Sequence, residues 1–305
     1  MLRYGELLRI IKICCKRLRR RSLRAKMKKN HAEKKDDFVI AFIFDVMECS
    51  MTDPTSYGWF HILWLFLTVG VTVLLCLLYK HGKIKNPMNV VFYTAMLVIV
   101  LEIYKQIYYS FSYDGGVQFD YQWYVFPWQF CSTPMYVGLL AGLTRGKLQS
   151  ALLDYLATFA LFAGTCVMIY PEDVFTVSVW INIQSMICHA SMIVVGVFLY
   201  YTGTVKARHK TILGGMSVFS VAVCMAVLLN ELAFVVGIVP NETFNMFFVS
   251  RHCAPSLPVY SLVQAVVPYP WCLFIYIAGF SAASYVLLLI AMLVKKIANK
   301  TKKVA

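Results

Sequence analysis

The sequence predicts an all-α protein, a polytopic helical bundle in a membrane, and three observations support this fold class. Hydrophobic residues make up 60% of the 305 residues and charged residues only 14%, whereas a soluble domain averages about 25% charged residues. The apolar residues form continuous runs of about 20 residues, the length that a membrane-spanning helix needs. Polar and apolar residues do not alternate within these runs, which argues against a closed β-barrel.

Seven apolar runs are predicted to be transmembrane helices. They cover residues 59–79, 88–110, 122–144, 148–170, 179–202, 211–239 and 268–294. We therefore expect one transmembrane domain over residues 59–294. The segment 38–58 before it contains an eighth run, Phe38–Met47, which is too short to span and carries Asp45. We expect this segment to be interfacial or re-entrant.

Basic residues are concentrated on one side of the predicted bundle. The loops after the first, third and fifth spans and the basic tail, residues 295–305, all carry Lys or Arg, whereas the loops of the other side carry only Arg251. The positive-inside rule then places the tail in the cytoplasm and residues 241–267 outside a cell membrane. Seven spans also put the N-terminal arm outside, although it is strongly basic, and the sequence leaves this conflict open.

The net charge of +14 comes from the two ends of the chain, so the sequence predicts no nucleic-acid-binding domain. In the arm, residues 1–37, apolar side chains recur at helical spacing beside a cluster of Lys and Arg. Such a segment either lies on an anionic lipid surface or remains a solvated tail. We expect membrane lipids to be the partners of this protein, and nothing in the sequence predicts an oligomeric state.

Several polar residues inside the predicted spans lie at a similar depth. Such groups are costly in hydrocarbon and usually mark function. At about 1.5 Å of rise per residue, Cys131 and His189 both lie about 15 Å from the outer side. The others near this level are Glu102, Lys105, Gln129, Asn230 and Glu231. We expect these side chains to converge in one outward-opening cavity, although Glu231 can instead simply neutralise Lys105.

A cysteine beside a histidine is the pattern of a nucleophile and its base, because the imidazole accepts the thiol proton. Cys131 and His189 are therefore the candidate catalytic pair, with Asn230 or Glu102 orienting the imidazole. Pro134 is expected to interrupt the third helix near Cys131. The competing interpretation is that Cys131 only packs in the core. No phosphate-binding loop or metal-binding motif is present, so we expect no metal and no cofactor.

The loop before the last span contains two groups of turn-forming residues, Asn245–Ser256 and Pro268–Trp271. These residues favour local backbone hydrogen bonds, and Trp271 suits a membrane interface. The loop is either a structured cap or a lid over the outward cavity. Asn245 and Trp271 are predicted to contribute to binding in the second case.

The motifs that carry a resemblance are Glu102-x-x-Lys105-Gln106, Phe126-Pro-Trp-Gln-Phe-Cys131, His189, Asn230, Asn245-Met-Phe, Pro255-Ser256 and Pro268-Tyr-Pro-Trp271. On these motifs the sequence resembles the YwaF-type integral membrane proteins over about residues 59–290. A eukaryotic branch of that family is associated with acyl transfer to phospholipids by a membrane-embedded Cys and His. More distant relatives are lipid-ester hydrolases with a Thr–His pair.

The resemblance implies that His189 is the family's histidine. The family tends to have His two positions before the cysteine, where this chain has Gln129, so the nucleophile position falls on Cys131 or Gln129 depending on register. The sequence therefore predicts a lipid acyltransferase or lipid-ester hydrolase. The alternatives are a non-enzymatic transporter or receptor that uses the same cavity, and a structural membrane protein.

Overall fold

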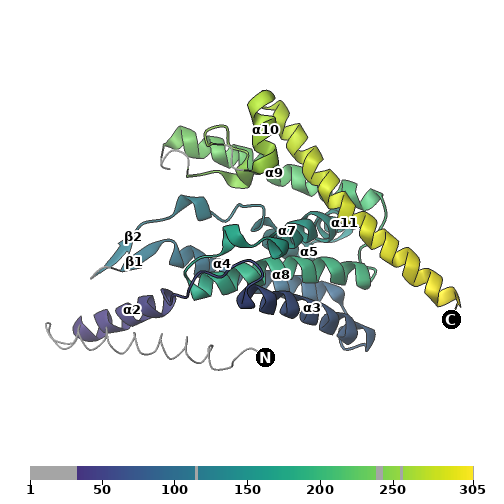
Figure 1. Cartoon of the computed structure of the whole chain (residues 1–305), viewed down its shortest axis with the longest axis horizontal. Coiled ribbons are helices and arrows are strands. Elements are labelled where there is room, and N and C mark those ends of the chain that lie inside the picture. Colours follow the sequence, from purple (N-terminus) through teal and green to yellow (C-terminus); the bar gives the residue numbers. More distant parts are fainter. Residues whose placement is uncertain (1–32, 114–115, 238–242, 255–256, 305) are drawn as a thin grey trace.

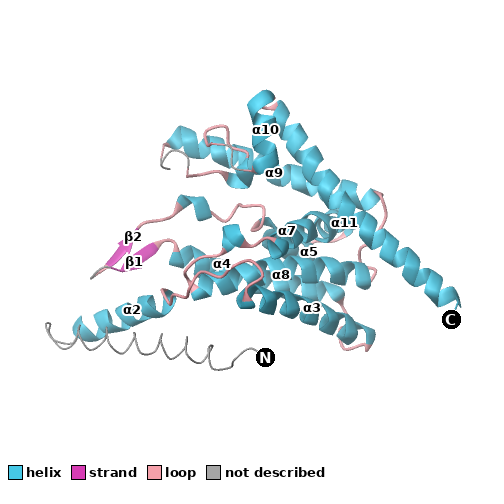
Figure 2. Cartoon of the chain, viewed as in Figure 1, coloured by secondary structure: helices cyan, strands magenta, loops and turns pink. Residues whose placement is uncertain are grey.

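The protein is an all-α membrane bundle, as the sequence predicts (Figures 1 and 2). The structure, a computed structural model, describes residues 33–113, 116–237, 243–254 and 257–304. Within these ranges, six helices are long and apolar enough to cross a membrane. A short two-stranded antiparallel hairpin is the only sheet in the described part of the chain.

Apart from the third span, the long helices follow the predicted apolar runs closely. They are α2 (Glu33–Met47), α3 (Trp59–Lys80), α4 (Pro87–Tyr108), β1 (Phe111–Tyr113), β2 (Val117–Phe119), the 3-10 turn η1 (Trp123–Val125), α5 (Thr133–Leu143), α6 (Gly146–Tyr155), the π-helical turn η2 (Leu156–Ala160), α7 (Leu161–Ile169), the 3-10 turn η3 (Glu172–Val174), α8 (Val179–Tyr201), α9 (Lys210–Val236), the 3-10 turn η4 (Met246–Phe248), α10 (Pro258–Val266) and α11 (Trp271–Val304). Together α6, η2 and α7 form one continuous span.

Local sequence explains where several of these helices begin and end. The Asn86 side chain accepts a hydrogen bond from the N–H of Met88 at the start of α4, and Pro87 occupies the first turn. The Ser178 hydroxyl caps α8 in the same way. Gly237 ends α9 in the left-handed conformation, with φ of 65°.

The third predicted span is not a continuous helix. After η1 the chain runs through residues 126–132 without regular structure, and the helix α5 has only 11 residues. Pro134 lies in the first turn of α5, where its missing N–H breaks no hydrogen bond, so it begins this helix rather than interrupting one. Irregular backbone at membrane depth is tolerated only where protein or water surrounds it, and here α4 and α8 lie alongside.

The helices alternate in direction, so the loops collect at two ends (Figure 1). We call the end with the α3–α4 and α8–α9 loops and the C-terminus the basic end, and the end with α2 and the β-hairpin the hairpin end. Residues 1–32 of the predicted arm lie outside the described residues. The helix α2 has 15 residues, too few to span a membrane, and its end is held by the Trp180 indole, which donates to Val46 O at 2.9 Å. At the other terminus, α11 continues past the predicted boundary at residue 294.

The centre of the bundle is formed by α8 and the α6–η2–α7 span. Within an apolar stretch of 18 residues, 67% of the residues are buried in each of these two spans, against 6% in α3 and 11% in α11. The peripheral helices therefore present mostly apolar side chains outward, as expected for contact with lipid tails. On the α9 side of the centre, Phe219 packs against aromatic rings from four other segments: Phe130, Phe159, Phe247, Tyr276 and Phe280.

Candidate functional site

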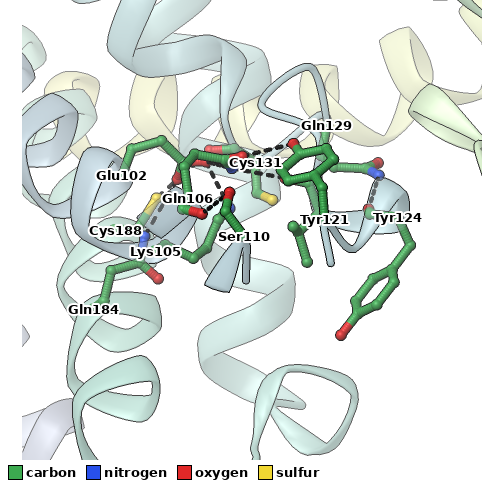
Figure 3. A network of polar contacts seen from close by, with 11 residues as sticks. Glu102, Lys105, Gln106, Ser110, Tyr121, Tyr124, Gln129, Cys131, Gln184 and Cys188 are labelled. Atoms are coloured by element: carbon green, nitrogen blue, oxygen red, sulfur yellow. Dashed lines mark hydrogen bonds and ion pairs between the residues drawn. The ribbon is translucent and has the colours of Figure 1, made fainter. Parts of the chain in front are cut away.

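A buried carboxylate on α4 is the centre of a polar network (Figure 3). Glu102 is 4% exposed. Its Oε1 atom accepts from Lys105 Nζ at 2.8 Å and from Gln106 Nε2 at 2.8 Å, and its Oε2 atom accepts from Gln184 Nε2 of α8 at 3.4 Å. A buried carboxylate is stable only when it is paired and hydrogen-bonded. Lys105 is thus neutralised by Glu102, one turn away, and not by Glu231.

Gln106 connects this network to the broken third span. Its Nε2 atom also donates to Val125 O at 2.9 Å, and its Oε1 atom accepts from the Tyr121 hydroxyl at 2.7 Å. Backbone carbonyls outside a helix need such partners when they are buried. The amide of Gln106 therefore holds the segment between the hairpin and α5 against α4.

Two cysteines lie beside the Glu102–Lys105 pair (Figure 3). Cys131 is in the irregular segment just before α5, and the Cys188 thiol of α8 donates to the Cys131 carbonyl at 3.6 Å. Both cysteines line a cavity of about 30 Å³ between α4, α5, η2 and α8. The other walls include Val91, Ala95 and Val98 of α4 and Met192 and Val195 of α8. The two thiols therefore lie where the polar network meets an apolar cavity.

His189 is buried, at 3% exposure, and its ring is held from one side only. Nδ1 lies 2.8 Å from Ser185 O, one turn earlier in α8. A carbonyl only accepts hydrogen bonds, so Nδ1 carries the proton and Nε2 has a free lone pair. Among the described residues Nε2 has no hydrogen-bond partner. The expected burial of His189 is observed, but its partner is Ser185 rather than a polar group of another span.

The backbone around His189 is closely packed against α7. A Cβ atom added at Gly164 would lie 2.6 Å from His189 O, so only glycine permits this approach. Cys131 and Cys188 line the cavity, whereas His189 does not. Among the described residues, no hydrogen bond joins the His189 ring to either thiol.

The model of one protein family matches residues 56–294, which include α3 to α10 and most of α11. The chain belongs to the TMEM164 family. It is accordingly a multi-pass membrane protein. The chain has no significant match among curated proteins or among solved structures. The TMEM164 match leaves out α2 and the basic arm, so the polar network and the cavity lie entirely within the part shared with the family.

Three more of the predicted site residues of this TMEM164-family chain, Asn230, Glu231 and Asn245, lie in a second cluster at the hairpin end. Asn230 of α9 is 2% exposed. Its Oδ1 atom accepts from the N–H of Met246 at 2.8 Å, and its Nδ2 atom donates to Met246 O at 3.1 Å. Both ends of the amide are thus bonded to the loop that precedes α10, and Asn230 does not orient His189.

That loop, residues 243–254, folds into the bundle. Phe247 is fully buried against Phe130 and Phe219, and its carbonyl accepts from the Tyr276 hydroxyl at 2.8 Å. The Asn245 side chain accepts from the N–H of Ser250 at 3.0 Å and so stabilises the turn. Of the two predicted roles of this loop, a structured cap fits this arrangement better than a lid over a cavity.

Glu231 lies at the outer edge of the second cluster. It forms an ion pair with Arg251 at 2.8 Å, and its Oε2 atom lies within hydrogen-bond distance of His252 Nε2, at 3.1 Å. The His252 ring also stacks on Phe234, with centroids 3.6 Å apart. Glu231 therefore fastens the loop 243–254 to α9.

Two further predicted residues have local roles. Gln129 Nε2 donates to Tyr124 O at 3.0 Å within the irregular segment, while its buried Oε1 has no partner in the described chain. Trp271 is 64% exposed at the start of α11 and touches neither cluster's polar groups. Residues 126–132, which include both candidate nucleophile positions, Gln129 and Cys131, are not helical.

Sequence reasoning did not assign Cys188, Gln106 or Tyr121 to the site. A signal for the first two was present: Gln184 and Cys188 are four residues apart on α8, as are Glu102 and Gln106 on α4, so each pair shares a helix face. Within the described residues no group of three or more His, Cys, Asp or Glu side chains is arranged to hold a metal ion.

Proposed function

We propose that this TMEM164-family protein is a lipid acyltransferase in which Cys131 carries the acyl group and His189 is the general base. The observation that carries the proposal is the unpartnered Nε2 of His189. A buried acceptor without a hydrogen bond costs about 1–3 kcal/mol, and this one belongs to the residue that follows Cys188 directly on α8. A base that receives a proton during the reaction needs such a free lone pair.

The position of Cys131 supports the role of nucleophile. Its irregular backbone places it at the junction of the Glu102 network and the apolar cavity. The cavity has room for only about one or two water molecules, so the proposal requires the helices around it to move apart when an acyl chain enters. The ammonium of Lys105 then stabilises negative charge on a thiolate or an oxyanion. The resemblance to YwaF-type proteins, whose eukaryotic branch uses a membrane-embedded Cys and His, points to the same pair.

The proposed reaction has two halves: acylation of Cys131 by a phospholipid, and transfer of the acyl group to a lysophospholipid. His189 Nε2 takes the Cys131 proton, the thiolate attacks the ester carbonyl of a phospholipid, and a C–S bond forms as the C–O bond breaks. The leaving alkoxide takes the proton from His189. In the second half, a lysophospholipid hydroxyl gives its proton to His189 and attacks the thioester. The new C–O bond forms as the C–S bond breaks, and the Cys131 thiolate takes the proton back from His189. Ser185, by holding Nδ1–H, fixes the tautomer that both halves require.

The test uses purified protein in phosphatidylcholine vesicles with one labelled acyl chain and unlabelled lysophosphatidylethanolamine. We expect label to appear in phosphatidylethanolamine. The variants Cys131→Ala and His189→Ala should each lower the rate by at least about 100-fold, the usual contribution of such groups. Cys166→Ala is the matched control, because Cys166 is an exposed cysteine of the same bundle.

Two outcomes would contradict the proposal. Turnover by Cys131→Ala at the wild-type rate would remove the nucleophile from the mechanism. Wild-type protein that binds the labelled lipid without transferring the chain would instead favour the transporter or receptor hypothesis. Detergent-solubilised variants should elute as monodisperse peaks like the wild type, so that a lost rate reports chemistry rather than misfolding.

A further inference from the structure

A second hollow lies at the basic end, between α9 and α11, away from the Glu102 network. It has a volume of about 430 Å³, within the range of small-molecule sites. Figure 1 shows α11 crossing α9 and continuing past the bundle to the C-terminus. The two helices are in contact where they cross, through Phe219 and Phe280 at 5.7 Å between ring centroids.

Two contacts between the α9 and α11 segments flank the hollow along the helices. Towards the bundle centre, the nearer contact is that of the Phe219 and Phe280 rings. Towards the basic end, His209 Nδ1 and the Tyr285 hydroxyl are 2.6 Å apart and hydrogen-bonded. Ten residues separate His209 from Phe219, which corresponds to about 15 Å along α9. The hollow is therefore a groove that lies between these two contacts and is open on its outer side.

The lining of the groove changes from apolar to cationic along its length. Leu213, Met216 and Ala282 form the apolar walls, and Leu213 is 58% exposed. Lys210 and His209 lie at the basic end with the Tyr285 hydroxyl. Among the described residues no acidic side chain forms an ion pair with Lys210. The groove thus offers an unneutralised ammonium and a hydroxyl at one end and hydrocarbon at the other.

We propose that this groove binds an anionic phospholipid. Its phosphate is held by Lys210, His209 and Tyr285, and an acyl chain lies along Leu213 and Met216 towards the aromatic contact. Basic pockets between transmembrane helices are suited to anionic headgroups. A free anion would leave the apolar walls uncovered, and a neutral lipid would leave Lys210 unpaired. The proposal is independent of the acyl-transfer mechanism.

The experiment measures thermal unfolding of the full-length protein in neutral detergent during titration with one of three probes. These are phosphatidylglycerol, phosphatidylcholine and inorganic phosphate. A ligand that binds the folded state raises the unfolding temperature with its concentration. We expect saturable stabilisation by phosphatidylglycerol, a much smaller effect of phosphatidylcholine, and none from phosphate at the same concentrations.

Three variants assign the effect to the groove. Lys210→Gln should weaken the apparent affinity for phosphatidylglycerol about fivefold, the usual contribution of one lysine near an anionic lipid. Tyr285→Phe should weaken it less, and Ala282→Trp should abolish saturation by filling the groove. Lys295→Gln, on the exposed extension of α11, is the charge-matched control and should bind like the wild type. If Ala282→Trp does not fold, Lys210→Gln and Tyr285→Phe decide whether the lipid binds in the groove.

Three results would overturn the proposal. Equal stabilisation by phosphatidylcholine and phosphatidylglycerol would show that charge plays no part. Equal stabilisation by inorganic phosphate would show that the apolar walls play none. A loss in Lys295→Gln as large as in Lys210→Gln would show that the lipid responds to the overall positive charge of this end and not to the groove.

Discussion

Two polar clusters in this protein come from the same kind of residue at similar depths, yet they differ in how completely they are bonded. Around Glu102, every carboxylate oxygen has a partner, but the buried Nε2 of His189, on the helix that supplies Gln184, has none among the described residues. Around Asn230, the amide is bonded at both ends to Met246, and Glu231 is bonded to Arg251 and His252.

The difference distinguishes a region with unused hydrogen-bonding groups from a region that only stabilises the fold. A fully bonded cluster gains nothing from a ligand, because any new contact must replace an existing one. The Asn230 cluster instead fixes a buried loop, residues 243–254, among the helices. Near the Glu102 cluster, Cys131 and Cys188 line a small cavity of about 30 Å³, and on α8 the buried Nε2 of His189 has no partner in the described chain. The variants below test this comparison, in order of decreasing expected effect.

The largest loss of stability is expected from Glu102→Ala. The substitution leaves the Lys105 ammonium, whose side chain is 15% exposed, without its partner. Removing one member of a buried pair typically costs about 3–5 kcal/mol. Thermal and denaturant unfolding in detergent would measure it. The double variant Glu102→Ala/Lys105→Met should recover most of the loss, and a double variant as unstable as the single one would contradict the pairing.

A smaller loss is expected from Asn230→Ala. Two backbone groups of Met246 lose their partners in a fully buried position, at about 1–3 kcal/mol for each unsatisfied group. Stability should fall while the acyl-transfer rate of the protein that remains folded stays near wild type. Ser217→Ala, on the exposed face of the same helix, is the control. If Asn230→Ala reduced the rate as strongly as His189→Ala, the result would contradict the separation of the two clusters and show that they act as one site.

The smallest effect is expected from Tyr121→Phe, which removes the hydroxyl that donates to Gln106 Oε1 at 2.7 Å. One such hydrogen bond contributes about 0.5–1.5 kcal/mol. The measurement is the shift in unfolding midpoint relative to Tyr93→Phe, a change on the outward face of α4, where Tyr93 is 67% exposed. Identical midpoints for the two variants would show that the network ends at Gln106.

Hydropathy predicted the long helices well, because a membrane-spanning helix must be apolar over its whole length and its ends are marked by caps and charged loops. The sequence placed the second span at 88–110 and the fifth at 179–202, and the structure has Pro87–Tyr108 and Val179–Tyr201. The third span was apolar enough to be predicted as a helix, yet it is broken. Mean apolarity does not report whether backbone hydrogen bonds run within a segment or to its neighbours, as Val125 O does to Gln106.

For the candidate site, counting residues along each helix predicted that Glu102, Lys105, Cys131 and His189 lie at similar depth. The structure pairs Glu102 with Lys105, places Cys131 beside Cys188 of α8, and bonds the His189 ring to Ser185 of its own helix. The same count included Asn230 and Glu231, which the structure places in a different cluster. Depth along a helix follows from residue number, but the direction in which a side chain points around the bundle depends on how the helices pack.

The amino-acid sequence alone was sufficient for the all-α membrane class, the positions of the long helices and the set of polar residues buried within them, because each of these follows from transfer free energies along a single helix. Only the packed structure decided which of those residues meet. The ring of His189 is held by its own helix, and the Cys131 carbonyl meets Cys188, 57 positions along the chain. Such contacts depend on the rotation and spacing of neighbouring helices, which close approaches such as Gly164 against His189 set and which no single segment encodes.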